Sequence, residues 1–265
     1  MPRRSIYDIL EAEEFNPDGE YDRLKHKFFE EYRFSRSSLY VHSGDIFGAI
    51  KVRGTCTDID DFIGRLGIDL HESYHNQDEL FDFIELIVLI HDSDPGPAFV
   101  KDDEYSSVFR NINIILEKMA HKLIWTDKGR IVVPADAVAE EAAEIIAQDN
   151  PRTALEILKY NHRSNKGDVE AKRKILKSLG DTIEPWLTGQ HHKDTEDAIG
   201  YILNNFNIRH NNISGSSKKE FFVTLDENEI EEWYDNLYTL IVSFMIEREQ
   251  KTILEKVFKH RKNNQ

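Results

Sequence analysis

Apolar residues recur along most of the chain with the spacing of helices. Between Asp78 and His91 they fall at about every third or fourth position, which is typical of a helix with a wide buried face. We therefore predict a helix that Asp78 caps and that ends before the prolines at positions 95 and 97. The same pattern predicts further helices over residues 102–121, 136–148, 150–160, 169–179, 194–209 and from 226 to beyond 244.

Two short β-prone runs interrupt this helical pattern. They are Leu123 to Trp125 and Ile131 to Val133, and the turn residues Asp127, Lys128 and Gly129 stand between them. Such an arrangement predicts a small β-hairpin, which must pack on helices because a two-stranded ribbon is marginally stable alone. The predicted fold class is all-α, in two helical units with a small β-hairpin insertion.

A polar, glycine-containing segment at residues 161–168 is the best place to divide the helices into two units. We predict an N-terminal helical domain over 1–162, with the hairpin near 123–133, and a C-terminal helical domain over 163–265. The last helix is the clearest of all, since Asp226 and Glu229 have the spacing of a capping box. Its predicted core face consists of Ile230, Trp233, Leu237, Leu240, Ile241 and Phe244.

Composition limits the classes of function. The chain has 265 residues, of which 40% are hydrophobic and 31% charged, as in a folded globular protein. A net charge of -15 argues against broad attraction to nucleic acid, so any such contact must be local. The lysine- and arginine-rich segment 248–262 could form such a patch, but a solvated basic tail is the simpler interpretation. The single cysteine, Cys56, fits a reducing compartment, and no apolar stretch is long enough to cross a bilayer. We expect a cytoplasmic protein with no membrane contact.

An Arg-His-Asn-Asn cluster at 209–212 ends the helix predicted over 194–209. If the helix continues through it, Asn205, Arg209 and Asn212 fall at i, i+4 and i+7 on one stripe that can hold a phosphate. The simpler interpretation is a helix C-terminus, where Arg and His stabilise the negative end of the helix dipole and Asn closes the last turn.

A second pattern, His71-Glu72-Ser73-Tyr74-His75, matches the H-E-x-x-H string of zinc peptidases. On a helix, His71 and His75 could bind zinc while Glu72 polarises a water molecule. The surrounding Asp69, Asn76 and Asp78 instead favour a polar connection before the next helix. The chain has no phosphate-binding P-loop, no dinucleotide fingerprint and no G-x-S-x-G elbow, and we expect no cofactor.

The C-terminal hundred residues resemble the HEPN superfamily, which consists of all-helical domains found in many prokaryotic toxins and abortive-infection proteins. The resemblance is carried by Ile208 to Asn212 at the end of one helix and by Glu231-Glu232-Trp233-Tyr234-Asp235 in the last helix. The whole chain is also similar to AbiJ-type abortive-infection proteins, in its helical order and in phrases such as Glu79 to Leu86.

This resemblance implies metal-independent RNA cleavage in a cleft between two protomers, with Arg209 holding the phosphate and a histidine moving the proton of the ribose 2'-hydroxyl. Active members place that closing histidine after four to six intervening residues, where this chain has Ser214, Gly215 and Ser216. His210 is then the remaining proton carrier. Because neighbouring residues on a helix point about 100° apart, Arg209 and His210 reach one phosphate only at a frayed helix end or across a dimer.

Three hypotheses follow. The first is a prokaryotic defence protein that binds or cleaves RNA with Arg209 and His210, with Asn205, Asn211 and Asn212 orienting the substrate, in a homodimer formed through the C-terminal helices. The second is a non-catalytic interaction module with a degenerate HEPN domain, whose acidic surface docks a basic protein partner. The third is a zinc hydrolase that uses His71, Glu72 and His75.

Overall fold

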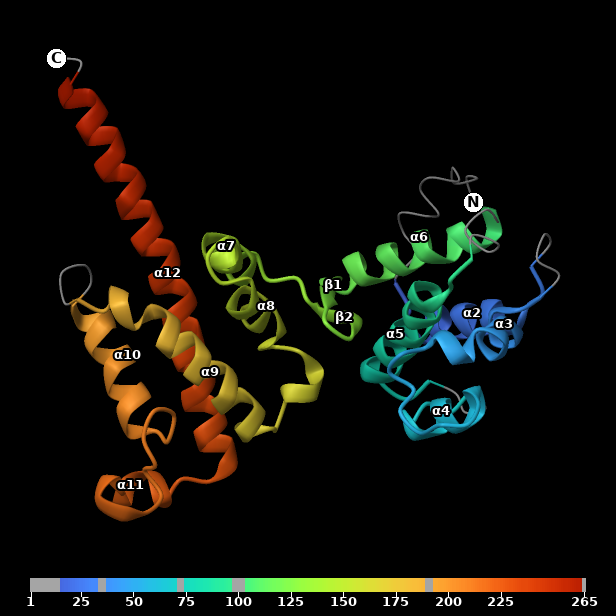
Figure 1. Cartoon of the computed structure of the whole chain (residues 1–265), viewed down its shortest axis with the longest axis horizontal. Coiled ribbons are helices and arrows are strands. Elements are labelled where there is room, and N and C mark those ends of the chain that lie inside the picture. Colours follow the sequence, from blue (N-terminus) through green and yellow to red (C-terminus); the bar gives the residue numbers. More distant parts are fainter. Residues whose placement is uncertain (1–14, 33–36, 71–73, 97–102, 189–192, 264–265) are drawn as a thin grey trace, which may run out of the picture. The chain divides into compact units, whose positions relative to one another are not determined.

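The computed structural model describes residues 15–32, 37–70, 74–96, 103–188 and 193–263, which are mostly helical (Figure 1). Its helices are α2 (Pro17–Phe29), α3 (Leu39–Asp45), α4 (Ile59–Arg65), α5 (Gln77–Ser93), α6 (Asp103–Lys118), α7 (Ala137–Ala147), α8 (Pro151–Lys159), α9 (Val169–Ile183), α10 (Lys193–Asn205), α11 (Glu220–Val223) and α12 (Glu227–Asn263). Two strands, β1 (His121–Thr126) and β2 (Gly129–Pro134), pair as one hairpin. Short 3-10 turns cover Phe47–Ala49, Arg163–Asn165, Glu184–Trp186 and Gly215–Ser217. The predicted all-α class with one β-hairpin is confirmed.

The chain divides into two compact units, Met1–Val132 and Val133–Gln265. This boundary lies earlier than the one predicted at 162/163, because α7 and α8 pack on α9 and α12 and share their core. The polar segment 161–168 is therefore a connection within the second unit. Asn165 holds it there, since its side-chain amide donates to the backbone carbonyls of Lys159 and Tyr160.

Unit 1 is built around α5. Eight of its residues are buried and they lie on nearly all sides of the helix, as expected for a central helix surrounded by others. Asn76, and not Asp78, is the N-cap, because the Asn76 side-chain oxygen accepts hydrogen bonds from the backbone N–H groups of Asp78 and Glu79. Helix α6 begins and ends close to the predicted limits and buries Val108, Ile112, Ile115 and Leu116.

Unit 2 is built around α9 and α12. The predicted capping box of α12 is confirmed, since the Asp226 backbone N–H donates to Glu229 at 2.9 Å and the Glu229 N–H donates back to Asp226 at 2.9 Å. Most of the predicted core face is also confirmed, because Leu237, Ile241 and Phe244 are fully buried. Trp233 is an exception: it is 40% exposed and packs by its ring against Phe206 at 4.7 Å.

Within the described residues, the structure contains no helix with the length and apolar character needed to span a membrane.

Candidate functional site

The Arg-His-Asn-Asn cluster lies in a loop and not on a helix. Helix α10 ends at Asn205, and Asn207 then adopts a left-handed φ of 59°, a conformation that turns the chain away from the helix axis. Arg209 follows this turn, and its backbone N–H donates to the Leu203 carbonyl at 3.0 Å. The predicted helix over 194–209 is therefore too long, and the stripe of Asn205, Arg209 and Asn212 does not form.

Arg209 is held against the end of α9. One guanidinium nitrogen donates to the Gly180 carbonyl at 3.0 Å, and another lies 3.1 Å from the Glu184 carboxylate. The Arg209 side chain is only 14% exposed, and its Nε is buried with no hydrogen-bond partner. In this conformation the guanidinium ties α9 to the loop after α10, and it does not face an open groove.

Gly180 makes this contact possible. A Cβ atom at this position would lie 2.7 Å from a methyl carbon of Leu203, which is closer than real Cβ contacts allow. The absence of a side chain lets α10 approach α9 closely, and that approach brings Arg209 within reach of the Gly180 carbonyl.

The asparagines of the cluster bond to the loop itself. Asn212 is fully buried and exchanges hydrogen bonds with Asn207, accepting from its backbone N–H at 2.7 Å and donating its own N–H to the Asn207 side chain at 3.1 Å. Its side-chain nitrogen donates to the Ser217 carbonyl. Asn211 accepts from the N–H groups of Ile213 and Ser214, as in an Asx turn.

Asn205, which precedes the cluster, and His210, which belongs to it, have different surroundings. Asn205 donates its side-chain amide to the Tyr201 carbonyl in the preceding helical turn. His210 is exposed. Thus the structure separates the five residues that the sequence placed in one site: Arg209 and Asn212 are in the interior, whereas His210 and Asn211 are at the surface.

A cavity of about 510 Å³ lies beside Asn207, but its charges are mixed. Lys166 and Arg173 line it together with Asp168, Glu170 and Glu227, and neither Arg209 nor His210 is among the lining residues. Arg173 is paired with Glu170 at 2.7 Å. Such a cavity offers no excess of positive charge for a phosphate.

The other part of the proposed HEPN resemblance, Glu231 to Asp235, includes two carboxylates that pair with the buried Lys172. The Lys172 ammonium group is 2.7 Å from Glu231 and 2.6 Å from Asp235, and it lies over the ring of Tyr160. The Tyr160 hydroxyl donates to Asp235 at 2.9 Å. Burial, together with the charge of Asp235, raises the pKa of Tyr160 far above its usual range, so the phenol stays protonated. Because each of these polar groups has a partner, the cluster fastens α9 and the end of α8 to α12.

The zinc-peptidase string is only partly described. His71 and Glu72 lie outside the described residues, and Tyr74 to Asn76 form a non-helical segment before α5. The His75 backbone N–H donates to the Glu79 carboxylate, which is a capping interaction. Thus His75 does not stand on the helix that the zinc hypothesis needs, and the described residues contain no group of three or more His, Cys, Asp or Glu side chains placed to hold a metal.

Two surfaces that the sequence analysis did not single out have clearer binding character. One is the free end of α12, residues 253–263, where apolar side chains are exposed. The other is a groove between α2 and α6 in unit 1. The residues of the groove have i, i+3, i+4, i+7 spacing and the apolar residues of α12 have i, i+1, i+4, i+5 spacing, so both could have been found in the sequence, which does not tell whether such a face is covered.

No family model, no curated protein and no solved structure matches the chain.

Proposed function

We propose that this chain is a protein-interaction module that self-associates through the free end of α12. The observation that carries the proposal is a group of four apolar residues on this part of the helix that other helices of unit 2 leave uncovered. Ile253, Leu254, Val257 and Phe258 are 50%, 53%, 55% and 55% exposed.

These four residues form one patch that faces away from the core of unit 2. A helix advances about 100° per residue, so Ile253, Leu254, Val257 and Phe258 all lie at least about 100° around the axis from the buried Ile241. Arg248, which precedes them, still faces the bundle, with its guanidinium 4.2 Å from the ring of Trp186. The patch is thus a second apolar face on a helix whose first face already packs in the core. Figure 1 shows that the last part of α12 extends past the other helices of unit 2.

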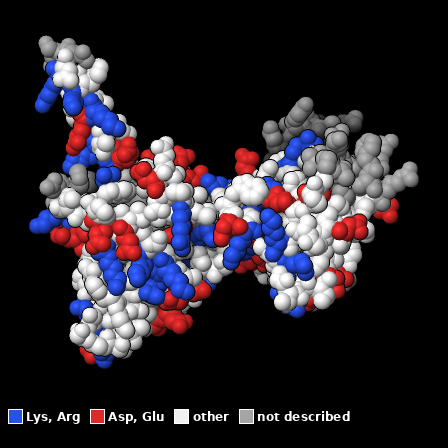
Figure 2. Space-filling view, in the orientation of Figure 1, with Lys and Arg blue, Asp and Glu red and all other residues white. Residues whose placement is uncertain are grey.

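The charges beside the patch favour a second copy in the antiparallel direction. Glu247 and Glu249 precede it together with Arg248 and Lys251, whereas Lys259, Arg261 and Lys262 follow it, and Figure 2 shows Lys and Arg gathered toward the free end of α12. Antiparallel pairing brings the acidic side chains of one copy near the basic end of the other. Parallel pairing would put the two basic ends together and cost Coulomb energy.

The size of the patch indicates a reversible dimer. Four side chains exposed by about half present roughly 400 Å² per copy, and two copies together bury on the order of 800 Å² before the stems of the flanking lysines are added. This is below the about 1,200 Å² that specific, stable interfaces bury as a minimum, so we expect a weak and transient dimer.

Sedimentation velocity across protein concentrations from about 1 to about 200 μM tests the proposal. We expect a monomer–dimer equilibrium that Leu254→Glu abolishes, because the new charge would be buried at the centre of the interface. Val138→Glu is the matched control: Val138 is 47% exposed on α7 of the same unit and should leave the equilibrium unchanged. Antiparallel pairing also predicts weaker association at high salt. A monomer at all concentrations, or a dimer that tolerates Leu254→Glu, would refute the proposal.

RNA binding is a second candidate, favoured by the basic end of α12. Four basic side chains at this end are exposed: Lys256, Lys259, Arg261 and Lys262. They form a local positive patch, which a chain with a net negative charge needs in order to contact nucleic acid. The HEPN resemblance and a role in defence stay predictions, and any cleavage mechanism must take into account that Arg209 is bonded to Gly180 and Glu184. A gel shift with total RNA in EDTA tests this candidate: binding that weakens with rising salt and is lost when Lys259 and Arg261 are replaced by glutamine would support it, and no shift would contradict it. Cleavage that survives chelation in the same incubation would support the HEPN-like mechanism.

A further inference from the structure

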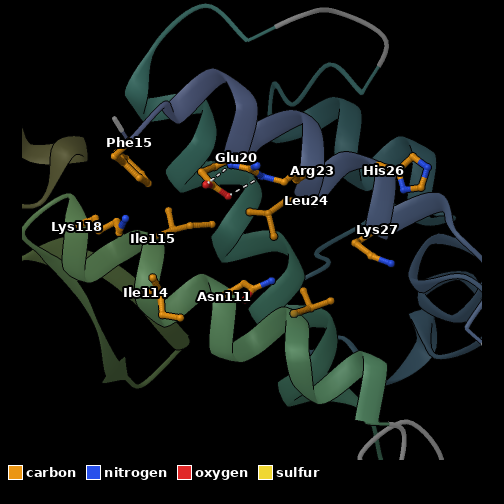
Figure 3. A pocket seen from close by; sticks show the side chains of 11 residues that line it. Phe15, Glu20, Arg23, Leu24, His26, Lys27, Asn111, Ile114, Ile115 and Lys118 are labelled. Carbon is orange, nitrogen blue, oxygen red and sulfur yellow. Dashed lines mark hydrogen bonds and ion pairs between the residues drawn. The ribbon is translucent and has the colours of Figure 1, made fainter. Parts of the chain in front are cut away.

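A groove separates α2 from α6 in unit 1, with a cavity volume of about 400 Å³ (Figure 3). Each helix contributes a stripe with the same spacing of i, i+3, i+4 and i+7, which places four side chains on one face. These residues are Glu20, Arg23, Leu24 and Lys27 on α2, and Asn111, Ile114, Ile115 and Lys118 on α6.

The floor of the groove is apolar and closely packed. Leu24, Val108 and Ile115 line it and are each less than 5% exposed, because their other sides belong to the core of unit 1. Ile114 stands on the wall and is 50% exposed. A ligand with a hydrocarbon part would displace water from Ile114 and from the apolar floor, and this burial of apolar surface would favour binding.

Positive charge predominates on the rim although the whole chain has a net charge of -15. Arg23, Lys27 and Lys118 outnumber Glu20, and Figure 3 shows Lys118 and Lys27 toward opposite ends of the groove. Arg23 is bonded to Glu20 at 3.1 Å, and Lys27 is paired with Glu30.

The surroundings of Lys118 differ from those of Arg23 and Lys27. Its ammonium group lies 5.8 Å from the centre of the Phe15 ring, and no described carboxylate forms an ion pair with it. The side-chain amide of Asn111, two helical turns before Lys118 at the other end of the stripe, is exposed and forms no hydrogen bond with a described residue. Lys118 and Asn111 therefore present donors to an anion without first having to release a carboxylate.

We propose that this groove binds a small amphipathic organic anion, with its hydrocarbon part along Leu24, Ile114 and Ile115 and its acidic group at Lys118. The volume is within the range of about 300 to 1,000 Å³ that small-molecule sites have. The apolar floor supplies most of the affinity, and the ammonium group selects the acidic end of the ligand, because opposite charges in a partly desolvated groove attract more strongly than in water.

The test is isothermal titration of the full chain with decanoate, and with decanol as a ligand of the same length without the charge. We expect saturable binding of decanoate and an affinity for decanol at least tenfold lower. Lys118→Gln should weaken decanoate binding about fivefold, which corresponds to the loss of one partly screened charge pair. Ile114→Asp should abolish it.

Lys25→Gln is the matched control, since Lys25 is on α2 but outside the groove, with its ammonium group 5.9 Å from the Tyr21 ring centre. It should keep the affinity within twofold of the original chain, and circular dichroism should show the same helical content in all variants. Equal affinities for decanol and decanoate, no saturation by decanoate at about 1 mM, or an unchanged affinity in Lys118→Gln would overturn the proposal. Binding of an acidic amphipathic peptide without binding of decanoate would also overturn it, and would indicate a protein partner at this groove.

Discussion

Replacement of Arg209 by alanine is expected to destabilise unit 2. The substitution removes the hydrogen bond to the Gly180 carbonyl, the ion pair with Glu184 and the packing of a side chain that is only 14% exposed. Arg209→Ala thus loosens the attachment of the 207–219 loop to α9. The effect should be local to unit 2, since both partners of the guanidinium lie there.

The three losses differ in size. A hydrogen bond from a charged group to a carbonyl contributes about 1.5 to 3 kcal/mol. The Glu184 carboxylate is 62% exposed, so its ion pair contributes about 1 kcal/mol or less. In the variant, the Gly180 carbonyl still accepts a hydrogen bond from the backbone N–H of Glu184. The substitution also removes the buried Nε that has no partner, and the desolvation penalty of that atom no longer opposes folding. We therefore expect a decrease of about 2 kcal/mol in the free energy of unfolding.

Urea unfolding followed by tryptophan fluorescence measures this change, because Trp186 and Trp233 both report on unit 2. Glu184→Gln is the control: it removes only the exposed partner and should cost less than about 1 kcal/mol. If Arg209→Ala stays within about 0.5 kcal/mol of the original chain, the guanidinium is not a structural tie, and its assignment to an open functional site regains its basis.

Two further predictions concern the packing of unit 2. Gly180→Ala should destabilise it by about 1 to 3 kcal/mol, because the added Cβ would lie 2.7 Å from Leu203. Gly200→Ala on α10 is the control: its Cβ meets nothing within 4 Å, and it should stabilise unit 2 by about 0.5 to 1 kcal/mol. Equal effects of the two substitutions in thermal unfolding would show that α9 and α10 are not in close contact. Hydrogen bonds from Lys172 and from the Gly167 backbone lower the pKa of Glu231 below its usual 4.5, so this carboxylate stabilises the fold above pH 4.5 and the contribution is lost as pH falls through the lowered pKa. Unfolding free energies measured below pH 4.5 should therefore decrease less steeply in Glu231→Gln than in the original chain, and parallel curves would contradict the role of the cluster.

Local signals in the sequence predicted most of the elements correctly. The hairpin follows from the turn residues up to Gly129 between two β-prone runs, and the start of α12 follows from the reciprocal bonds of Asp226 and Glu229. Asp136 and Asn150 are the N-caps of α7 and α8, at the positions where these two helices were predicted to begin. In each case, the physical cause acts within four residues, which is why the sequence alone is sufficient.

The sequence did not predict the domain boundary or the exposed face of α12, because both depend on contacts between residues that are far apart in the chain. The polar segment 161–168 has the composition of a domain linker, but α7 and α8 before it contribute to the same core as α9 and α12, so the boundary lies at 132/133. The exposure of Ile253 and Phe258 has a similar origin: their spacing is that of a core stripe, and only the three-dimensional arrangement shows that no helix of unit 2 covers them.

Arg209 shows why a motif and a site are different observations. In sequence it belongs with His210 and two asparagines, which together have the chemistry of a phosphate site. In the structure it belongs with Gly180 and Leu203, because the missing side chain of Gly180 allows α10 to approach and the turn at Asn207 places the guanidinium beside the Gly180 carbonyl. For Arg209 to bind a phosphate in this loop conformation, it would have to leave the Gly180 carbonyl, and the ligand would have to offset about 2 kcal/mol before it gained affinity. The exposed face of α12 and the groove at Lys118 require no such release, which is why binding at these two surfaces is the better supported function.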